Sequence, residues 1–231
     1  WQPASIPLSE EIGIVKPKAV VTLANGEKIN LGEEVAPIAE KDGTRIQYHD
    51  GQLVYSSQSQ TAEPQVLYNE LTVPRGGEYS LVLGDGTRVW LNAGSRMTYS
   101  QGFGVDNRMI ELEGEGYFEV RRNEKLPFFV KTKDLQLQVL GTKFNFRDYP
   151  EDHEVVVSLL EGKVELNNLL KKEKEAILAP DERAILNKTN GRMTVETVTA
   201  SNASQWTDGY LFFDEELLPD IVKELERSYN V

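Results

Sequence analysis

The sequence predicts a mainly β fold, in which repeated β-hairpins form a twisted β-sandwich or a β-solenoid-like domain, followed by a truncated C-terminal β-α-β unit. Three observations lead to this prediction. Apolar residues alternate with polar ones at a period of two from about residue 12 to about residue 200, as in strands with one buried face. After residue 213 the period changes to about 3.6, which is typical of a helix. Dipeptides that favour tight hairpin turns recur: Asn25-Gly26, Asp42-Gly43, Asp50-Gly51, Asp85-Gly86, Asn190-Gly191 and Asp208-Gly209.

A hairpin unit is repeated within the chain. Residues 21–31 align without gaps on residues 81–91, and residues 42–48 form a partial third copy. The shared pattern is apolar-x-apolar-x-(Asn or Asp)-Gly-x-basic-apolar-x-apolar, which predicts two alternating strands around a turn with the basic residue pointing outward. A single copy is typical of any hairpin, but the gapless match favours an architecture of repeated hairpins.

Further strands are expected where the alternation is regular. Candidates with the apolar residues on one face are 110–112, 118–120, 135–139, 144–146 and 155–159. Residues 56–65 are polar and low in complexity, and predict an exposed linker. The run 210–213 predicts a strand. The apolar residues within 214–229 predict a helix that starts near Leu218, because Pro219 fits only a first turn.

The composition excludes several classes of protein. There are 37 Asp and Glu against 25 Lys and Arg, giving a net charge of −12 with no basic cluster, so nucleic acids and anionic membrane surfaces are not expected partners. The chain has no Cys, which excludes disulfides, cysteine zinc sites and thiol nucleophiles. No apolar run approaches the ~18 residues of a membrane helix. Because the sequence begins at Trp1, we expect either a removed leader or a fragment of a longer protein.

The residues that carry catalytic chemistry do not form a motif. His49 and His153 each stand alone in a polar stretch, so surface histidines are expected rather than a metal site or a catalytic triad. Gly102-Phe103-Gly104 and Gly114-Glu115-Gly116 lack the third glycine of a dinucleotide-binding loop and are expected where strands bend or pack closely.

Two other functions are compatible with the residues. A glycosidase would need two converging carboxylates, and the acids Glu111, Glu113, Glu115 and Glu119 are close in sequence. Alternation places the first three side by side on one strand face, where solvent-exposed acids are the simpler interpretation. A carbohydrate-binding β module of the cell envelope would stack sugars on aromatic side chains, with Trp90, Tyr99 and Trp206 as candidates.

A series of motifs resembles one family, in order along the chain. The series is residues 73–79 (VPRGGEY), 83–95 (LGDGTRVWLNAGS), 108–120 (RMIELEGEGYFEV), 127–130 (PFFV), 139–146 (VLGTKFNF), 160–164 (LEGKV), 178–182 (LAPDE) and 206–213 (WTDGYLFF). From about residue 19 to its end, the chain resembles the FecR family of anti-sigma factors that accompany TonB-dependent receptors.

The resemblance implies a domain organisation and a location. Residues 1–68 would be an N-terminal juxtamembrane β segment and linker, and residues 69–205 the FecR β domain. Residues 206–231 would start a truncated C-terminal α/β domain similar to the short N-terminal domain of secretins and TonB-dependent receptors. The chain would be the periplasmic portion of a single-pass inner-membrane protein, whose membrane helix lies outside this sequence.

The resemblance also implies the partners. The periplasmic region would bind the signalling domain of an outer-membrane TonB-dependent receptor, and a cytoplasmic segment outside this sequence would bind an extracytoplasmic-function sigma factor. Such a receiver would need no catalytic residue, cofactor or metal. We expect partner binding at Leu211 and Phe213, in the apolar strand that begins the C-terminal domain.

Overall fold

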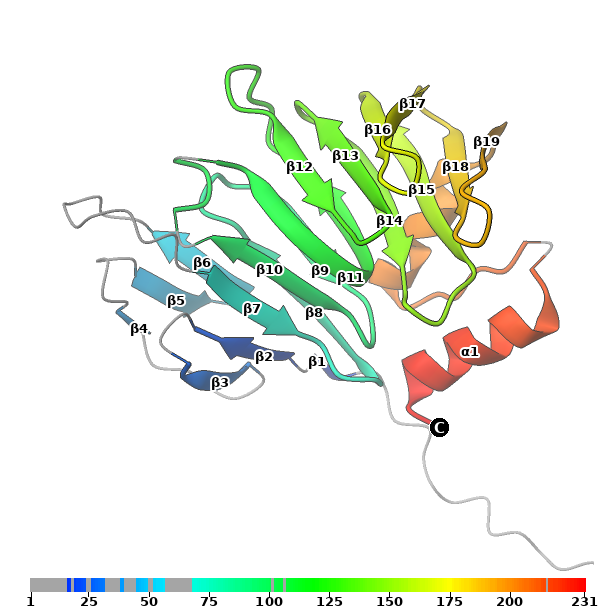
Figure 1. Cartoon of the computed structure of the whole chain (residues 1–231). Coiled ribbons are helices and arrows are strands. Elements are labelled where there is room, and N and C mark those ends of the chain that lie inside the picture. Colours follow the sequence, from blue (N-terminus) through cyan, green and yellow to red (C-terminus); the bar gives the residue numbers. More distant parts are fainter. Residues whose placement is uncertain are drawn as a thin grey trace, which may run out of the picture.

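The computed structural model describes residues 16–17, 19–23, 26–31, 38–39, 45–49, 52–56, 68–100, 102–105, 107–214 and 216–231. These residues form nineteen strands, one 3-10 helix and one α-helix (Figure 1). The prediction of a mainly β fold is therefore confirmed. The linker predicted for residues 56–65 lies outside the described residues apart from Ser56, which ends a strand.

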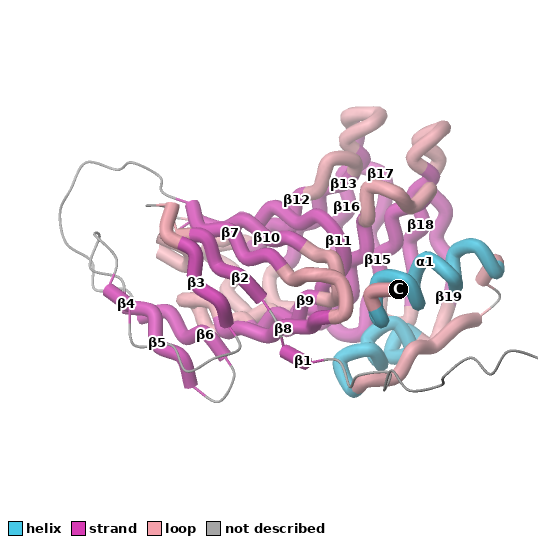
Figure 2. Tube along the Cα trace, turned by 90° about the horizontal axis from the view of Figure 1, so that it is seen from below, coloured by secondary structure: helices cyan, strands magenta, loops and turns pink. Residues whose placement is uncertain are grey.

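The strands form one hydrogen-bonded network that is folded into two layers (Figures 1 and 2). The first layer contains, in spatial order, β3 (Lys28–Leu31), β2 (Ala19–Thr22), β7 (Tyr68–Thr72), β10 (Arg96–Ser100), the first half of β11 (Met109–Glu119), β12 (Phe128–Lys131), β13 (Leu135–Val139), β16 (Val164–Asn168) and β17 (Glu173–Leu178). The second layer contains β4 (Ile38–Ala39), β5 (Arg45–His49), β6 (Gln52–Ser56), β8 (Gly77–Val82), β9 (Arg88–Leu91), the second half of β11, β14 (Lys143–Asp148), β15 (Glu154–Glu161), β18 (Glu182–Asn187) and β19 (Met193–Thr197), with β1 (Lys16–Pro17) beside the start of β8.

The chain builds the two layers alternately. The hairpin β12–β13 lies in the first layer, β14–β15 in the second, β16–β17 in the first and β18–β19 in the second. The fold therefore has the two packed layers of a sandwich and the repeated alternation of a solenoid, the two forms that the sequence pattern left open. Among the described strands, β1, β3, β4, β17 and β19 each pair with a single neighbour, so neither layer closes.

The two full copies of the repeat form equivalent hairpins in different layers. In β2–β3, Gly26 has a φ of 84° and donates its N–H to the carbonyl of Leu23 at 2.8 Å; in β8–β9, Gly86 has a φ of 85° and makes the same bond to Leu83 at 2.8 Å. A positive φ costs glycine little, which explains why both turns carry it. The turn of the partial third copy lies outside the described residues, and its residues 45–48 belong to β5.

The core lies between the layers and consists of the apolar residues at alternate strand positions. Phe118 of β11 stacks on Phe144 of β14 with ring centroids 4.9 Å apart, and Phe128 of β12 lies 6.3 Å from Phe118 across the layers. Each fully buried large apolar side chain contributes roughly 1.5–3 kcal/mol to folding. The burial pattern thus confirms the faces expected from period-two alternation.

Strand β11 joins the two layers. Its residues 109–113 pair with β10 and β12 in the first layer, and its residues 114–119 pair with β9 and β14 in the second. Gly114 stands at the crossing with a φ of 109°, and a Cβ at this position would lie 2.7 Å from the Cα of Ser95. The crossing therefore requires glycine, as expected for a site where strands bend and pack closely.

The C-terminal region agrees with the sequence pattern in one element and differs in two. Helix α1 spans Leu218–Tyr229, as predicted, with Pro219 in its first turn and Asn230 ending it in the left-handed conformation. The strand predicted at residues 210–213, the first strand of the proposed β-α-β unit, was wrong: these residues are irregular. No described strand runs beside them to complete a ladder. The N–H of Tyr210 instead donates to the carbonyl of Gln205, at the end of a 3-10 helix, η1 (Ala200–Asp208), that the sequence pattern did not indicate.

Within the described residues, neither η1 nor α1 has the length and apolar character needed to cross a membrane.

Candidate interaction site at the C-terminal helix

The C-terminal segment folds back onto the second layer. Figures 1 and 2 show η1 beside β14 and β15, and α1 near the turn between them. On β14, Phe144 and Phe146 point into the core, so the alternate residues Asn145 and Arg147 lie on the outer surface of the second layer. The C-terminal segment contacts these two side chains, Asn145 through Trp206 and Arg147 through Glu224.

A buried carboxylate lies at the centre of this contact. Glu115 is buried, and its two oxygens accept hydrogen bonds from the Nδ2 atoms of Asn145 at 2.8 Å and Asn92 at 2.9 Å. The indole N–H of Trp206, in η1, donates to Oδ1 of Asn145 at 3.1 Å. Glu115 thus accepts hydrogen bonds from two neutral amides, and Trp206 joins η1 to this network.

Helix α1 is held by charged side chains. Arg227 donates from Nη1 to Oδ1 of Asp152 at 3.0 Å and from Nη2 to Oε2 of Glu224 at 2.8 Å, and its guanidinium lies 3.9 Å from the ring centroid of Tyr149. Arg147 pairs with Asp152 at 3.0 Å. We call the following group the polar junction: Glu115, Asn145, Arg147, Asp152, Glu224 and Arg227.

The environment shifts the protonation of the acids in and beside the polar junction. Burial, and then the charge of Glu224, raise the pKa of Glu115 to about 7. Partial burial and the charge of Glu115 raise the pKa of Glu78, on β8, to about 7. Burial alone would raise the pKa of Asp152, but Arg147 and Arg227 hold it below its ordinary value. The polar junction therefore combines ion pairs with acids that titrate near neutral pH.

Helix α1 presents its polar face to the β layers and its apolar face to solvent. Glu224 is 5% exposed and Arg227 1%, whereas Leu218 is 71% exposed. The other apolar residues of the exposed stripe follow at the spacing of one helix face: Val222, Leu225 and Tyr229. An amphipathic helix normally buries its apolar stripe against its own domain. The orientation of α1 thus leaves an apolar surface available for a partner.

The irregular segment before α1 carries the predicted binding residues. Leu211 and Phe213, expected at the partner contact, are half-buried. Their neighbours Tyr210 and Phe212 are 67% and 45% exposed, and are therefore more accessible to a partner. This segment therefore adds exposed aromatic residues to those of α1.

Replacing Trp206 with Phe tests the contact of η1 with the second layer. The substitution keeps the aromatic packing but leaves the buried Oδ1 of Asn145 without its indole donor. We expect the free energy of unfolding to fall by about 1–3 kcal/mol, measured by urea denaturation. Trp90→Phe is the control, because Trp90 is half-buried against Tyr117 with ring centroids 5.4 Å apart, and should cost less. Equal losses in the two variants would contradict a structural role for the indole hydrogen bond.

The acids considered for a glycosidase do not converge. Glu111 and Glu113 lie on the outer surface of the first layer and pair with Lys131 at 3.4 Å and with Arg96 at 3.1 Å. Glu115 points outward like Glu111 and Glu113, because Ile110, Leu112 and Phe118 all point into the core, but it belongs to the second-layer half of β11. The expectation that it is solvent-exposed was wrong, because it is buried. Glu119 lies on the second layer beside Arg88. Without two facing carboxylates, the arrangement does not support glycoside hydrolysis.

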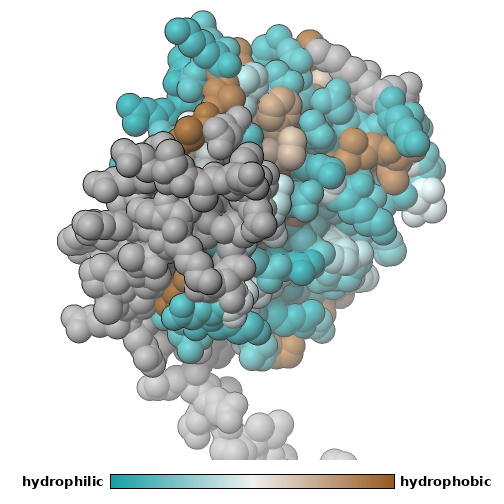
Figure 3. Space-filling view, turned by 60° about the vertical axis from the view of Figure 1, so that its left-hand side comes forward, coloured by the Kyte–Doolittle hydropathy of each residue, from teal (hydrophilic) through white to brown (hydrophobic). Residues whose placement is uncertain are grey.

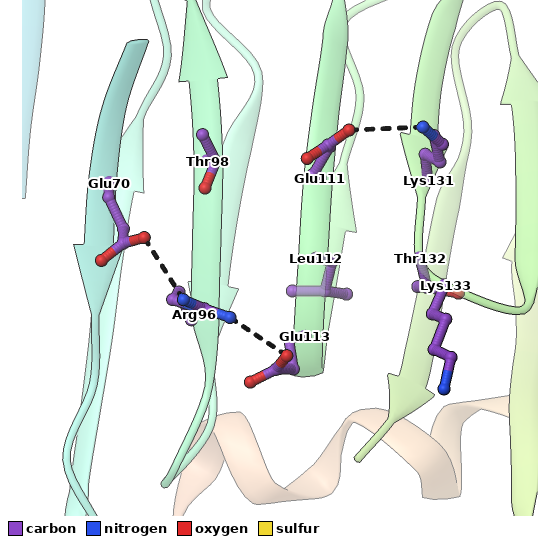
Figure 4. A pocket seen from close by; sticks show the side chains of 9 residues that line it. All are labelled: Glu70, Arg96, Thr98, Glu111, Leu112, Glu113, Lys131, Thr132 and Lys133. Atoms are coloured by element: carbon purple, nitrogen blue, oxygen red, sulfur yellow. Dashed lines mark hydrogen bonds and ion pairs between the residues drawn. The ribbon is translucent and has the colours of Figure 1, made fainter. Parts of the chain in front are cut away.

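A shallow groove of about 460 Å³ contains two of these acids (Figure 4). It crosses β7, β10, β11 and β12 and displays the row Glu70, Arg96 and Glu113, in which Arg96 pairs with both acids. Exposed pairs of this kind contribute little to stability, and their charges are already compensated. The groove is thus an ion-paired, solvated sheet face.

The structure places the other sequence candidates apart from any site. His153 is exposed in the turn before β15, and His49 lies on β5. Among the residues that the structure describes, no group of three or more His, Asp and Glu could hold a metal ion. Tyr99 and Trp206 are buried, so they cannot form a sugar-stacking platform with Trp90. On the face that Figure 3 shows, the described surface is mainly hydrophilic, with scattered apolar patches.

Comparison with known proteins identifies the family. The family model "FecR protein" matches residues 69–165. Two crystal structures of a candidate anti-sigma factor from Parabacteroides distasonis ATCC 8503 are each 38% identical to this chain. The matches cover 71% and 70% of this chain and 76% and 74% of those chains, with TM-scores of 0.65 and 0.64. No curated protein matches the sequence.

The two lines of comparison agree with the motifs found in the sequence. The family model spans the region from β7 to the start of β16, which includes the crossing strand β11 and its glycines. The identity to the solved structures extends over most of both chains. The chain therefore belongs to the FecR family of anti-sigma factors.

Proposed function

We propose that this chain is the signal-receiving region of a membrane-anchored anti-sigma factor. In this proposal it is the periplasmic portion of a single-pass inner-membrane protein, and it relays the state of an outer-membrane TonB-dependent receptor to an extracytoplasmic-function sigma factor. The sigma factor would bind a cytoplasmic segment that is not in this sequence. Membership of the FecR family supports the regulatory role.

The proposal divides the chain into three parts. Residues 1–68 are the juxtamembrane segment and linker, residues 69–205 the FecR β domain, and residues 206–231 the beginning of a C-terminal α/β domain. The polar contact between α1 and the second layer is consistent with the last part acting as a separate unit, because contacts between domains are commonly more polar than a domain core. The net charge of −12 is consistent with a protein partner rather than a nucleic acid.

The observation that carries the proposal is the exposed apolar surface of the C-terminal segment. Its members that carry the assignment are Tyr210 and Phe212, because the exposed stripe of α1 would pack against the rest of the proposed C-terminal α/β domain. Aromatic side chains at the centre of an interface commonly supply most of the binding energy. We therefore assign the receptor contact to this segment, with Phe212 as its anchor and the half-buried Leu211 and Phe213 as its support.

Binding of the receptor's signalling domain tests the proposal. Purified signalling domains of the TonB-dependent receptors from the same organism would be titrated with this chain by isothermal calorimetry. We expect one of them to bind, and Phe212→Ser to weaken that binding at least about tenfold, which corresponds to ~1.4 kcal/mol.

A matched control separates the site from general surface effects. Tyr68 on β7 is an exposed aromatic residue that is 57% exposed and lies on the other layer, so Tyr68→Ser should bind as the unsubstituted chain does. Leu211→Asp should also weaken binding. Binding that is unchanged by both Phe212→Ser and Leu211→Asp would show that the receptor contact lies elsewhere.

A further inference from the structure

Helix α1 is docked on a surface that is rich in acids. Arg147 and Arg227 are the two cations of the polar junction, and they lie among six carboxylates contributed by β8, β11, the β14–β15 turn and the C-terminal segment: Glu78, Glu115, Glu151, Asp152, Glu216 and Glu224. The phenol of Tyr149 lies beneath the guanidinium of Arg227. The charges of Asp220 on α1 and Arg183 on β18 act on Glu216. If every acid were ionised, the contact would carry a large excess of negative charge.

The net charge of this contact depends on the protonation state of Glu115. Its oxygens contact amide groups and no cation directly, while the charges of Glu224, Glu78 and Arg147 act on it from α1, β8 and β14. Burial disfavours the charged form of Glu115. Its cross-strand partner on β14 is Arg147, whose Nη1 lies 3.8 Å from Oε2 of Glu224 on α1, so the carboxyl and the docked helix share this cation. Ionisation of Glu115 would also place a negative charge near Glu224, which pairs with Arg227 within α1 and with Arg147 on β14.

Docking of α1 covers the ring of Tyr149 and includes one backbone bond, from the N–H of Gly76 to the carbonyl of Arg227 at 2.8 Å, but otherwise it rests on polar side chains. The residues that α1 buries against the β layers are Glu224, Arg227 and Ser228, and its apolar stripe already faces solvent. Buried ion pairs contribute little net free energy because desolvation offsets the attraction between the charges. The Nε atom of Arg227 is buried and has no hydrogen-bond partner among the described residues, so one donor stays desolvated in the docked state. Docking of α1 therefore rests on polar contacts and not on burial of its apolar stripe.

We propose that α1 is a pH-dependent, releasable element, which docks on the second layer while Glu115 is protonated and is released when Glu115 ionises. The direction of the pH dependence follows from the thermodynamic linkage between proton binding and docking. The docked state shields Glu115 and raises its pKa to about 7, whereas release hydrates the carboxyl and returns its pKa towards the ordinary value of 4.5. The docked state therefore binds the proton more tightly, and docking weakens as the pH rises from about 4.5 to about 7.

The other acids do not change the pH range over which docking weakens. Glu78 titrates in the same range and acts in the same direction, because its pKa is also raised to about 7. The pKa of Asp152 is lowered, so its ion pairs stabilise docking above its ordinary pKa of 3.8 and are lost only at lower pH. The proposal does not depend on the receptor, and its test needs no partner protein.

The absence of Cys from the sequence allows clean spin labelling. Labels would be attached at Glu226→Cys, on the exposed side of α1, and at Thr194→Cys, on β19, and their separation measured by pulsed electron paramagnetic resonance from pH 5.5 to pH 8. We expect one distance at pH 5.5 and a second, longer one that grows as the pH rises. The docking equilibrium should change at least about tenfold, because each pKa unit changes an equilibrium up to tenfold.

Three variants in the labelled chain identify the group responsible. Glu115→Gln cannot ionise, so docking should lose the pH dependence that this position supplies. Its Nε2 cannot accept one of the two amide hydrogen bonds, so docking should also be weaker at every pH. Glu78→Gln removes a neighbouring acid that also favours release when it ionises, so release should shift to higher pH. Glu161→Gln, an exposed acid on β15 that pairs with Lys143, is the matched control and should leave the transition unchanged.

Two results would overturn the proposal. One is a distance distribution of the unsubstituted labelled chain that is the same at pH 5.5 and pH 8. The other is a transition in Glu115→Gln that matches that of the unsubstituted chain. If Glu115→Gln fails to fold, as judged by circular dichroism, an unchanged midpoint in Glu78→Gln would overturn it.

Discussion

Replacing Arg108 with Met is expected to lower the free energy of unfolding by about 3–5 kcal/mol, because removing one partner of a buried ion pair leaves the other charge uncompensated. Arg108 is 1% exposed and donates from Nε to Oδ2 of Asp85 at 2.7 Å and from Nη1 to the carbonyl of Leu126 at 2.9 Å. Its guanidinium also lies 5.4 Å from the ring centroid of Phe128. Arg108 thus ties the β8–β9 turn to the loop before β12.

Urea denaturation followed by circular dichroism would measure this loss. Arg96→Met is the matched control, because the side chain of Arg96 is 48% exposed and pairs with Glu70 and Glu113 on the outer surface of the first layer. We expect that control to change the free energy of unfolding by less than about 1 kcal/mol. Similar losses in the two variants would show that burial of Arg108 does not determine its contribution.

Replacing Gly114 with Ala is expected to lower the free energy of unfolding by about 3–5 kcal/mol, from backbone strain and overpacking together. Gly114 has a φ of 109°, and an added Cβ would lie 2.5 Å from Oγ of Ser95 and 2.7 Å from its Cα. Because the closest backbone atom belongs to the neighbouring chain segment, the strands would have to separate where β11 crosses between layers.

Gly26→Ala separates the two contributions in the Gly114 experiment. Gly26 also has a positive φ, of 84°, but a Cβ there would meet no atom within 4 Å. We expect Gly26→Ala to cost about 1–2 kcal/mol, the strain of the backbone alone. Thermal and urea denaturation of both variants would measure the difference. A cost for Gly114→Ala no larger than that for Gly26→Ala would rule out the steric requirement at the crossing.

Most of the β structure could be predicted from local patterns. The strands within 69–200, the two repeated hairpins and the helix from Leu218 follow from periodicity and turn residues, which depend on neighbours in the sequence. The strand predicted at 210–213 failed because a strand also needs a partner from elsewhere in the chain. The 3-10 helix η1 was missed because its residues carry no clear periodic signal.

The candidate site was less predictable. The approximate location, in the C-terminal segment, came from the apolar run 210–213, but the exposed members of that run are Tyr210 and Phe212. Glu115 was expected among solvated acids on a regular strand face. The signal that could have separated it from Glu111 and Glu113 is its position between Gly114 and Gly116, since glycines inside a strand mark a bend or a close approach.

The sequence by itself determined which residues can form strands, where the hairpins turn and which family the chain resembles, because these properties are written in residues that are neighbours along the chain. Only the tertiary structure decided that β11 crosses between two layers, that Glu115 is buried, and that α1 turns its polar face inward. The physical reason is that burial and pKa depend on groups brought together from distant positions: Glu115 is raised in pKa by burial and by the charge of Glu224, more than 100 residues further along the chain.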